Sequence, residues 1–367
     1  MGTELPDDFK CPISLEIMSD PVILSSGHTF DRASIQRWLE SGNRTCPITK
    51  LLLPAQPSLI PNHALRSLIS NYTLSSSPPR SQPCPSPQAL LAQLTSPSST
   101  AVAKLDSLRT LHRLSKHNPI FRHQITDSGA VSVILRFVVS ADTTLQEAAL
   151  SVLFYLSLDD DNKVGLVAEG AISGVVAALR TGTDSCRALA ATTLTSLAVV
   201  EVNKGTIGHH PFAIVALVEL LQNGKRRGQR EAATAIYTLC SFLENRRRVV
   251  RSGAVPVLVQ LAGSGVERAV EVLGLLGKCK EGRQEMENFN GFVQTLVEVL
   301  KGGSSRSVSH ALATLGLVCA NSERIYLEAI KEGVWEVSLG LVKDENEKIR
   351  RNATTLIHVL QRYRLTG

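Results

Sequence analysis

The 367-residue sequence contains no long run of apolar residues, and its N-terminus lacks a basic and apolar signal region. Because about 18 consecutive apolar residues are needed to cross a bilayer, we expect no transmembrane segment. The seven cysteines are odd in number and scattered, which argues against a framework of disulfide bonds. These absences favour a protein of the cytoplasm, the nucleus or both.

Motifs for catalysis by a nucleophile, a metal or a bound nucleotide are also absent. No GxSxG, HExxH or P-loop pattern occurs in the chain. Cys186, Cys240, Cys279 and Cys319 lie in apolar helical patterns, where a thiol packs as a small apolar group. The sequence therefore indicates no covalent chemistry on its own side chains and no cofactor.

Residues 10–72 have the sequence pattern of a small α+β domain. Two loops, over 11–18 and 45–50, are separated by a predicted hairpin over 21–30 and a predicted helix over 32–41. The pattern therefore places both loops next to one hairpin and one helix.

The two helices of this segment have recognisable starts. Asp31 is the predicted N-cap of the first helix, and Trp38 is predicted to lie beside both loops. The second helix is predicted to start at Asn62, after a proline. The apolar residues on one face of this helix, which we expect to close the core, are Leu65, Leu68, Ile69 and Tyr72.

The two loops resemble those of zinc-bound RING domains but lack the metal ligands. Two structural zinc sites need about eight Cys or His ligands, usually in closely spaced pairs. Only Cys11, His28, Cys46 and His63 are available here, and none forms a CxxC pair. We therefore expect no metal, with both cysteines buried as small apolar residues and the loops held by hydrogen bonds and ion pairs.

Six short blocks follow one another in this segment: Cys11-Pro12-Ile13-Ser14, Asp20-Pro21-Val22, Gly27-His28-Thr29-Phe30-Asp31-Arg32, Ile35-Gln36-Arg37-Trp38, Cys46-Pro47 and Leu59-Ile60-Pro61-Asn62. Together they resemble the U-box of plant U-box E3 ubiquitin ligases, over residues 5–72. The resemblance implies a metal-free, RING-like α+β fold. One departure is the stretch 51–54, which is more apolar than the family's usual turn.

Residues 73–88 change in composition to serine and proline, with five prolines. Such a chain extends by about 3.1 Å per residue and acts as a spacer between domains. We predict a linker here; a docking site for an SH3-like partner is the alternative.

After the linker, residues 89–367 repeat a short turn motif. The motif recurs at intervals of 41, 41, 42, 38 and 42 residues, in the segments Ser128-Gly129-Ala130-Val131, Glu169-Gly170-Ala171-Ile172, His210-Pro211-Phe212-Ala213, Ser252-Gly253-Ala254-Val255, Asn290-Gly291-Phe292-Val293 and Glu332-Gly333-Val334-Trp335. A period of about 40 residues indicates a helical solenoid, and small residues such as Ala190 and Ala232 permit close helix packing.

The repeats resemble armadillo repeats, and their position after a U-box resembles the plant U-box and armadillo ligases. We therefore predict an all-α armadillo-repeat solenoid of about six units over residues 89–367. Two departures stand out: Pro211 replaces the turn glycine, and the 38-residue interval is expected to shorten the loop around Gly263 to Val266.

The resemblance implies an E3 ubiquitin-protein ligase, an enzyme that binds a ubiquitin-charged E2 and promotes transfer to a substrate lysine without bonding to ubiquitin itself. It places Ile13, Leu15, Trp38 and Pro47 in the groove that receives the E2, and Lys50 at the activating contact to E2 and ubiquitin. Core packing is the alternative for the first four residues, and a solvated charge is the alternative for Lys50.

The resemblance also implies that the solenoid recruits a protein substrate or a receptor-type regulator. An alternative function is a non-catalytic armadillo adaptor in which the U-box is only structural. Autoubiquitination with purified components would separate the two.

The net charge of +6 is concentrated in one part of the predicted solenoid. The basic residues that we predict to form an acidic-partner patch are Lys225, Arg226, Arg227, Arg230, Arg246, Arg247, Arg248 and Arg251. We expect the loop at Lys225 and the helix end at Arg246 to lie near one another; a solvated face is the alternative. Nucleic acid is not an expected partner, because interleaved aromatic residues and a recognised reader motif are absent.

Overall fold

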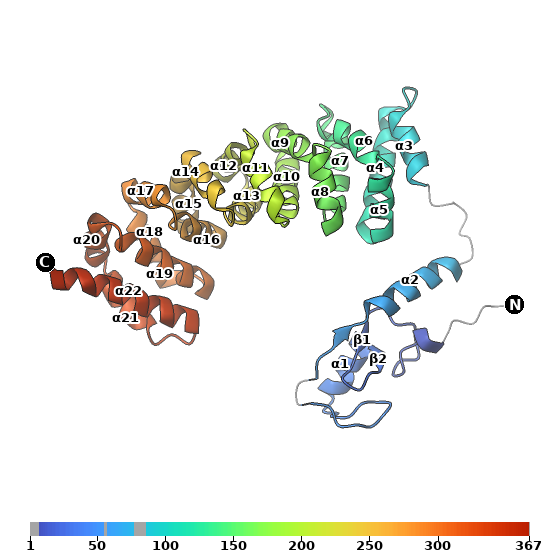
Figure 1. The fold of residues 1–367 in the computed structure, drawn as a ribbon, viewed down its shortest axis with the longest axis horizontal. Helices are drawn as coiled ribbons and strands as arrows, with labels where there is room; N and C mark the ends of the chain where they lie inside the picture. The colour runs from blue at the N-terminus through green and yellow to red at the C-terminus, as the bar shows by residue number, and fades with distance from the viewer. Residues whose placement is uncertain (1–6, 55–56, 77–85, 367) are drawn as a thin grey trace. The chain divides into compact units, whose positions relative to one another are not determined.

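The computed structural model describes residues 7–54, 57–76 and 86–366, with side chains described except at 70–76 and 362–366. The chain divides into two compact units, Met1–Cys84 and Pro85–Gly367. The described residues form 22 α-helices, three short β-strands and one 3-10 helix, η1 (Asp7–Phe9), as Figure 1 shows. No single helix among them is long and apolar enough to cross a membrane; one pair, Asp160–Ala168 with Ala171–Thr181, passes that test only when joined across an 83° bend.

The first unit contains a three-stranded antiparallel sheet with β1 (Pro21–Ile23) at its centre. β2 (Thr29–Asp31) and β3 (Ile60–Pro61) pair with its two edges. The turn between β1 and β2 contains Gly27 at φ +81°, so the predicted hairpin and its glycine are confirmed. β3 was not predicted, because two residues ending in a proline carry no strand pattern in the sequence.

Both predicted helices of the first unit start at the expected residues. Asp31 caps α1 (Arg32–Glu40), since its Oδ1 accepts from the Ala33 amide at 3.2 Å. Asn62 precedes α2 (His63–Ser76), and its Oδ1 accepts from the Leu65 amide at 3.1 Å. α2 therefore continues four residues into the segment predicted as a linker, and α3 (Pro87–Thr95) begins before that segment ends. Residues 77–85 lie outside the described residues.

The core of the first unit consists of ten buried apolar residues from both loops, the sheet and the helices. Cys11 and Cys46 are fully buried among them, as predicted. Ile69 of α2 is buried in this core, and Leu65 packs against it. Leu68, predicted on the same face, is exposed because it lies on the flank of the helix; the side chain of Tyr72 lies outside the described residues.

The second unit starts with α3 and α4 (Ala101–His117) and continues as six groups of three helices. In chain order these are α5 (Pro119–Asp127), α6 (Ala130–Val138) and α7 (Thr143–Leu156); α8 (Asp160–Ala168), α9 (Ala171–Thr181) and α10 (Asp184–Leu197); α11 (Glu201–His209), α12 (Ala213–Asn223) and α13 (Arg226–Leu239); α14 (Leu243–Arg251), α15 (Ala254–Gly263) and α16 (Glu267–Leu276); α17 (Lys280–Asn288), α18 (Phe292–Gly302) and α19 (Ser305–Cys319); and α20 (Glu323–Lys331), α21 (Val334–Leu341) and α22 (Glu347–Thr366). In Figure 1 the groups stack side by side in chain order. The all-α solenoid predicted from the repeats is therefore present.

The third helices of the groups, α7, α10, α13, α16, α19 and α22, pack against one another in sequence; we call them the third-helix row. Each carries one alanine at the same position, and all six alanines are fully buried: Ala149, Ala190, Ala232, Ala269, Ala311 and Ala353. A larger side chain at these positions would push neighbouring helices apart. The predicted role of small residues in close helix packing is thus confirmed.

A left-handed residue connects the first and second helices in five of the six groups. It is glycine in each case, for example Gly129 at φ +71° and Gly253 at φ +74°. In the third group the connection runs through Pro211 and Phe212, and Phe212 has φ −111°. The missing glycine therefore corresponds to a turn that needs no positive φ.

Buried asparagines on first helices connect consecutive groups. The Asn203 side chain on α11 donates to the Lys163 carbonyl on α8 at 3.2 Å and to the Leu197 carbonyl at the end of α10 at 3.0 Å. Asn245 makes the equivalent pair of bonds one group later. At the corresponding position of α17 stands Gly282, where a Cβ would lie 2.1 Å from a backbone carbonyl oxygen. The asparagine series therefore ends where the backbone approaches too closely for a side chain.

The 38-residue interval shortens a helix rather than a loop. α16 has 10 residues, whereas α10 and α13 have 14 each. The loop before α16, over 264–266, has three residues, one more than the loop before α13. The prediction of a shorter loop is therefore wrong. Ala269 and Leu276 keep their places in the core, so the missing residues correspond to the first turn of the helix.

Candidate functional site

The two loops of the first unit are built in the same way, 35 residues apart. In the first loop the Cys11 amide donates to the Glu16 carbonyl at 2.7 Å, and the Leu15 amide donates to the Cys11 carbonyl at 2.8 Å. In the second loop Cys46 and Lys50 make the same pair of bonds, at 2.9 and 3.0 Å. Isolated bridges, Lys10 with Ile17 and Thr45 with Leu52, close the two loops. The molecule therefore presents two copies of one loop.

The equivalent residues of the two loops, Leu15 and Lys50, both have a left-handed backbone. Their φ values are 60° and 58°, and no other non-glycine residue in the described ranges has positive φ. A side chain in this conformation costs about 1 to 2 kcal/mol relative to the ordinary helical region. Backbone strain of this kind is characteristic of sites where a side chain must point in a set direction.

A network of carboxylates fixes the first loop to α1 and α2. Oδ2 of Asp31 accepts from the amides of Ser19 at 2.8 Å and Asp20 at 3.0 Å, while its other oxygen caps α1. Asp20 in turn pairs with Arg32 at 2.7 Å and with Arg66 of α2. The predicted use of hydrogen bonds and ion pairs is therefore confirmed at these residues.

The two loop thiols also take part in hydrogen bonds. Cys11 Sγ accepts from the Asp31 amide at 3.3 Å, and Cys46 Sγ accepts from Ser26 Oγ at 3.1 Å. Burial alone would raise the pKa of the Cys46 thiol, but hydrogen bonds from Ser26 and Thr49 outweigh it and lower the pKa to about 7. Among the residues that the structure describes, no three His, Cys, Asp or Glu side chains form a group able to hold a metal ion.

A surface depression of about 330 Å³ lies between the first loop and α1. Ile13 and Trp38 form its apolar part, and both are half-buried and pack against the core. Trp38 Nε1 donates to the Thr45 carbonyl at 2.9 Å, which ties the indole to the start of the second loop. The prediction that Trp38 lies beside both loops is therefore confirmed.

The depression also has a polar wall that the sequence reasoning missed. Ser34 and Arg37 of α1 and its C-cap residue Ser41 line it together with Ser14 of the first loop. Ser34, Arg37 and Ser41 follow the helical spacing of Trp38, so that spacing was the signal that could have found them. The wall offers hydroxyl and guanidinium groups beside an apolar floor.

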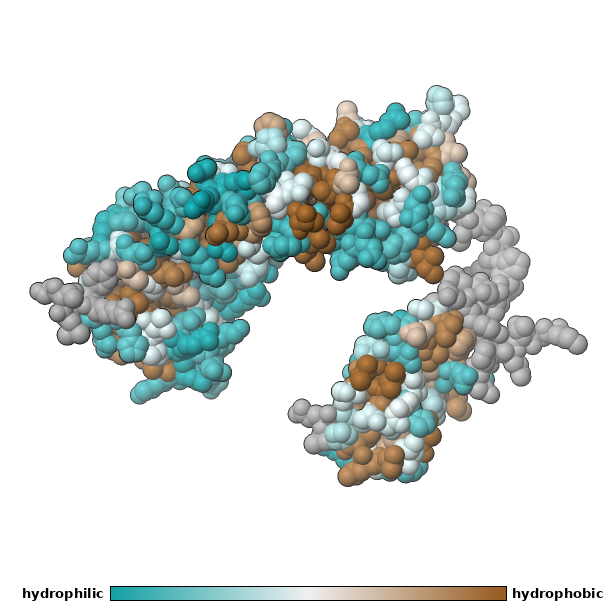
Figure 2. All heavy atoms as spheres, in the orientation of Figure 1, coloured by the Kyte–Doolittle hydropathy of each residue, from teal (hydrophilic) through white to brown (hydrophobic). Residues whose placement is uncertain are grey.

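The remaining predicted residues of this site lie around the depression rather than in it. Leu15 is 74% exposed, although its side chain is large and apolar. Lys50 Nζ donates to the Pro47 carbonyl at 2.9 Å and lies 6.0 Å from the centroid of the Trp38 ring. Leu51 and Leu52 after it are also exposed, and Figure 2 shows hydrophobic surface on this unit at the end away from α2. The second loop therefore combines one cation with exposed apolar side chains.

The eight basic residues predicted to form one patch lie at the two ends of α13. Lys225, Arg226, Arg227 and Arg230 stand at its start, whereas the other four belong to α14, which follows its end. A 14-residue helix spans about 21 Å. Arg246 Nε donates to the carbonyl of Cys240, directly after α13, at 2.8 Å. The expected convergence of the two halves is therefore wrong, because α13 separates them.

Several of these charges have partners in the solenoid. Lys225 pairs with Asp184 at 2.9 Å, and Arg247 pairs with Glu281 at 3.2 Å. Arg248 donates to His209 at 2.6 Å. Arg230 instead lines a pocket with two arginines from later helices that were not predicted to take part. The eight basic residues therefore do not act as one free patch, because several of them are paired within the solenoid and Arg230 belongs to a separate pocket.

Comparisons with known proteins match both units. Residues 5–77 match the family described as "U-box domain", and residues 88–364 match the family described as "Plant U-box protein ARM repeat region". The chain is 56% identical over 367 residues to U-box domain-containing protein 8 of Arabidopsis thaliana, with 98% of each chain covered. It is 29% identical to E3 ubiquitin-protein ligase PUB23 of the same plant, covering 90% of this chain and 86% of that protein.

Other similar proteins are longer or less similar in sequence. U-box domain-containing protein 16 of Arabidopsis thaliana is 30% identical over 98% of this chain, which spans 55% of that protein. An engineered protein of known crystal structure aligns with 75% of this chain and 68% of its own, with a TM-score of 0.68 and 21% identity. That likeness concerns the fold alone.

Proposed function

Because the chain belongs to the plant U-box proteins with an armadillo repeat region, we propose that it is an E3 ubiquitin-protein ligase that binds a charged E2 through its first unit and a protein substrate through its second. The fold and the family predicted from the sequence are confirmed by the same matches. The observation that carries the proposal is the pair of equivalent loops, whose strained outer residues, Leu15 and Lys50, lie in the loops that flank Trp38.

In this proposal the depression between the first loop and α1 receives an apolar loop of the E2. Ile13 and Trp38 supply a half-buried apolar floor, and Pro47 contributes from the second loop. Leu15 adds an exposed apolar contact at the edge. An exposed leucine with a costly backbone conformation is better explained by a partner than by the packing of the free chain.

Lys50 has a different role in the proposal, since it supplies charge rather than apolar area. Its ammonium donates to the Pro47 carbonyl at the surface, from where it can reach the E2-bound ubiquitin. Holding the thioester of a charged E2 in one orientation accelerates transfer by positioning and electrostatics, without a nucleophile on the ligase.

The apolar contact is tested with Leu15→Ala in the full-length chain. Because Leu15 is exposed, the melting temperature should stay nearly unchanged, whereas affinity for an E2 should fall roughly 10- to 30-fold, as for an anchor worth about 1.4 to 2 kcal/mol. Ile60→Ala on β3, also an exposed large apolar residue of the first unit, is the matched control and should bind the E2 normally. Equal losses in both variants would contradict the assignment.

The activating role is tested with Lys50→Ala in single-turnover discharge of a charged E2 to free lysine. Binding of the uncharged E2 should change little, while discharge should slow about tenfold or more; Lys50→Arg, which keeps the charge, should recover part of the rate. If Lys50→Ala discharges the E2 at the wild-type rate, Lys50 has no activating role and is only a solvated charge. If the wild-type chain makes no ubiquitin conjugates with a broad panel of E2 enzymes, the adaptor function replaces the ligase proposal.

A further inference from the structure

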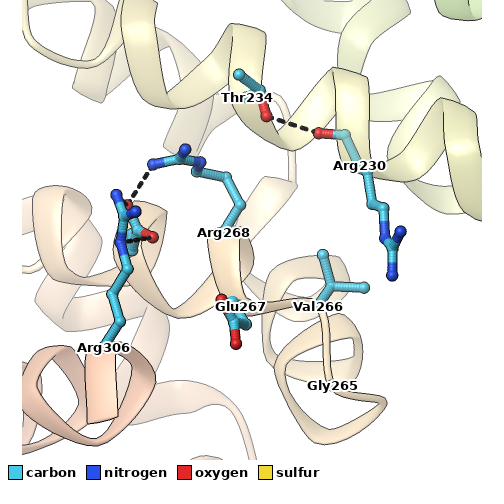
Figure 3. A pocket seen from close by; sticks show the side chains of 8 residues that line it. Arg230, Thr234, Gly265, Val266, Glu267, Arg268 and Arg306 are labelled. Carbon is cyan, nitrogen blue, oxygen red and sulfur yellow. Dashed lines mark hydrogen bonds and ion pairs between the residues drawn. The ribbon is translucent and has the colours of Figure 1, made fainter. Parts of the chain in front are cut away.

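The shortened α16 leaves a pocket in the third-helix row. Its volume is about 270 Å³, and it lies between α13, α16 and α19, where the first turn of a 14-residue helix would otherwise stand. The loop residues Gly265 and Val266 form its floor in place of that turn (Figure 3). The other residues that line it are all polar or charged: Arg230, Thr234, Glu267, Arg268, Glu271 and Arg306.

One carboxylate holds two of the three arginines of this pocket in place. Glu271 is 2% exposed and accepts from Arg306 through Nε at 2.6 Å and Nη2 at 3.0 Å. It also accepts from Arg268, whose guanidinium lies 4.6 Å from the centroid of the Tyr237 ring. Figure 3 shows the side chains of Arg268 and Arg306 directed toward one another, in agreement with their shared ion pairs to Glu271. Two positive charges therefore share one buried negative charge, which leaves an excess of one.

Arg230 differs from the other two arginines in having no partner for its guanidinium among the residues that the structure describes. Its side chain is exposed, and the hydrogen bond drawn at Arg230 in Figure 3 is made by its backbone carbonyl, which accepts from Thr234 at 2.9 Å. Within the described parts of the chain, no carboxylate pairs with this guanidinium. It stands on the α13 side of the pocket, opposite Arg306 on the α19 side. The pocket thus combines two arginines held by Glu271 with a third arginine that makes no ion pair in the described parts of the chain.

The charges around Glu271 also act on a neighbouring histidine, which they keep uncharged. Burial lowers the pKa of His310 on α19, and the charges of Arg306, Arg268 and Lys348 lower it further, while Glu271 opposes them. The acidic side chain that remains at the pocket is Glu267, in the first turn of α16, where its charge favours the helix. With three arginines against two glutamates, the lining carries a net charge of +1.

From this geometry we propose that the pocket binds one anionic side chain, a carboxylate or a phosphorylated hydroxyl, in an acidic segment of a protein partner. Planar guanidinium groups pair with carboxylates and phosphates through two parallel hydrogen bonds, and Arg230 has these donors free. A volume of about 270 Å³ suits a side chain and its flanking backbone. The partner is a protein segment rather than a nucleic acid, because nucleic-acid binding draws on many phosphate contacts along a strand and this pocket provides one.

The proposal is tested by binding the full-length chain to an oriented peptide library in which glutamate, phosphoserine or alanine occupies a fixed central position. Wild-type protein should enrich glutamate or phosphoserine peptides, and the relative enrichment of the two identifies which anion the pocket prefers. Peptides selected in this way should lose about tenfold in affinity, measured by fluorescence anisotropy, when the anionic residue is changed to alanine.

Arg230→Ala should remove this preference while leaving the melting temperature unchanged, because its side chain is exposed and its guanidinium has no partner among the described residues. Arg226→Ala removes the same charge from the exposed start of α13, outside the pocket, and should keep the preference. No enrichment of either anion by the wild type, or equal losses in the two variants, would overturn the proposal. Binding is measured without ubiquitin or E2, so the result is independent of the ligase proposal.

Discussion

The described cysteines of the two units are buried in different electrostatic surroundings. In the first unit, hydrogen bonds lower the pKa of Cys46 to about 7 in spite of its burial. In the second unit, burial raises the pKa of Cys186 to about 11 and that of Cys240 and Cys319 to about 12. Cys11 and Cys46 of the first unit thus act as hydrogen-bond acceptors, whereas Cys186, Cys240 and Cys319 of the second unit are buried where ionisation of the thiol is disfavoured.

The same contrast holds for the whole of each unit. The first encloses ten buried apolar residues and depends on Asp20 and Asp31 to hold its loops. The second has one apolar core that continues from α3 to α22, in which each group of helices packs on its neighbours. A local change should therefore act locally in the first unit and spread in the second, as in other repeat proteins.

The largest effect on stability is expected for Phe30→Ala in the first unit and Phe292→Ala in the second, which we compare. Both side chains are fully buried, so each substitution should lower the free energy of unfolding by about 3 to 5 kcal/mol. In Phe30→Ala only the transition of the first unit should shift, whereas Phe292→Ala on α18 should weaken the groups on both sides. Hydrogen exchange along the full-length chain locates the protection that is lost. Loss confined to α18 itself would show that the groups unfold independently.

A smaller effect is expected when Asn203 is changed to alanine. The change removes two hydrogen bonds and leaves buried carbonyls of α8 and α10 without a donor, at a cost of about 1 to 3 kcal/mol. Thr206→Ala on the same helix removes only a bond to the Val202 carbonyl at the surface and is the control. Denaturant unfolding measures both. Equal stability of the two variants would mean that the asparagine series does not couple the groups.

The smallest effect is a difference in pH dependence between the units. A thiol whose pKa falls on folding stabilises the fold increasingly as pH rises. Through Cys46, the free energy of unfolding of the first unit should therefore increase by on the order of 1 kcal/mol between pH 7 and 9. The second unit should lose stability above pH 9, because its thiols have raised pKa values and ionise only when unfolded. Denaturant unfolding at several pH values resolves both slopes. Ser26→Ala should flatten the first; an unchanged slope would contradict the role of the Ser26 hydrogen bond.

Local signals in the sequence predicted most of this architecture. The N-cap at Asp31 and the turn glycines were visible because each satisfies a need of its own backbone. The position of Trp38 followed from helical spacing. β3 was not predicted, because its pairing with β1 rather than local preference makes it a strand. The left-handed conformation of Leu15 and Lys50 was not predicted, because leucine and lysine rarely adopt positive φ.

The pocket at α16 was hidden for a different reason. A shortened interval tells how many residues are missing, but whether a loop or a helix loses them depends on which positions the core requires. Similarly, eight basic residues that are close in sequence were predicted to form one patch, although α13, which is about 21 Å long, separates the first four from the last four. Arg268 and Arg306 were not predicted because their partner, Glu271, comes from another part of the chain than the basic cluster.

The short α16 bears on how chains of this kind diverge. Where a binding surface is built from substitutions, every new contact must appear one residue at a time, whereas the loss of one helical turn opens a pocket in a single event. Arg230 and Arg306 belong to the adjacent helices α13 and α19, so the short α16 leaves open a space that an additional first turn would cover. Insertion of about four residues before Glu267 would reverse it. Under the proposal above, the length of the stretch between Gly253 and Gly291 therefore decides whether the solenoid has this anion-binding pocket at all.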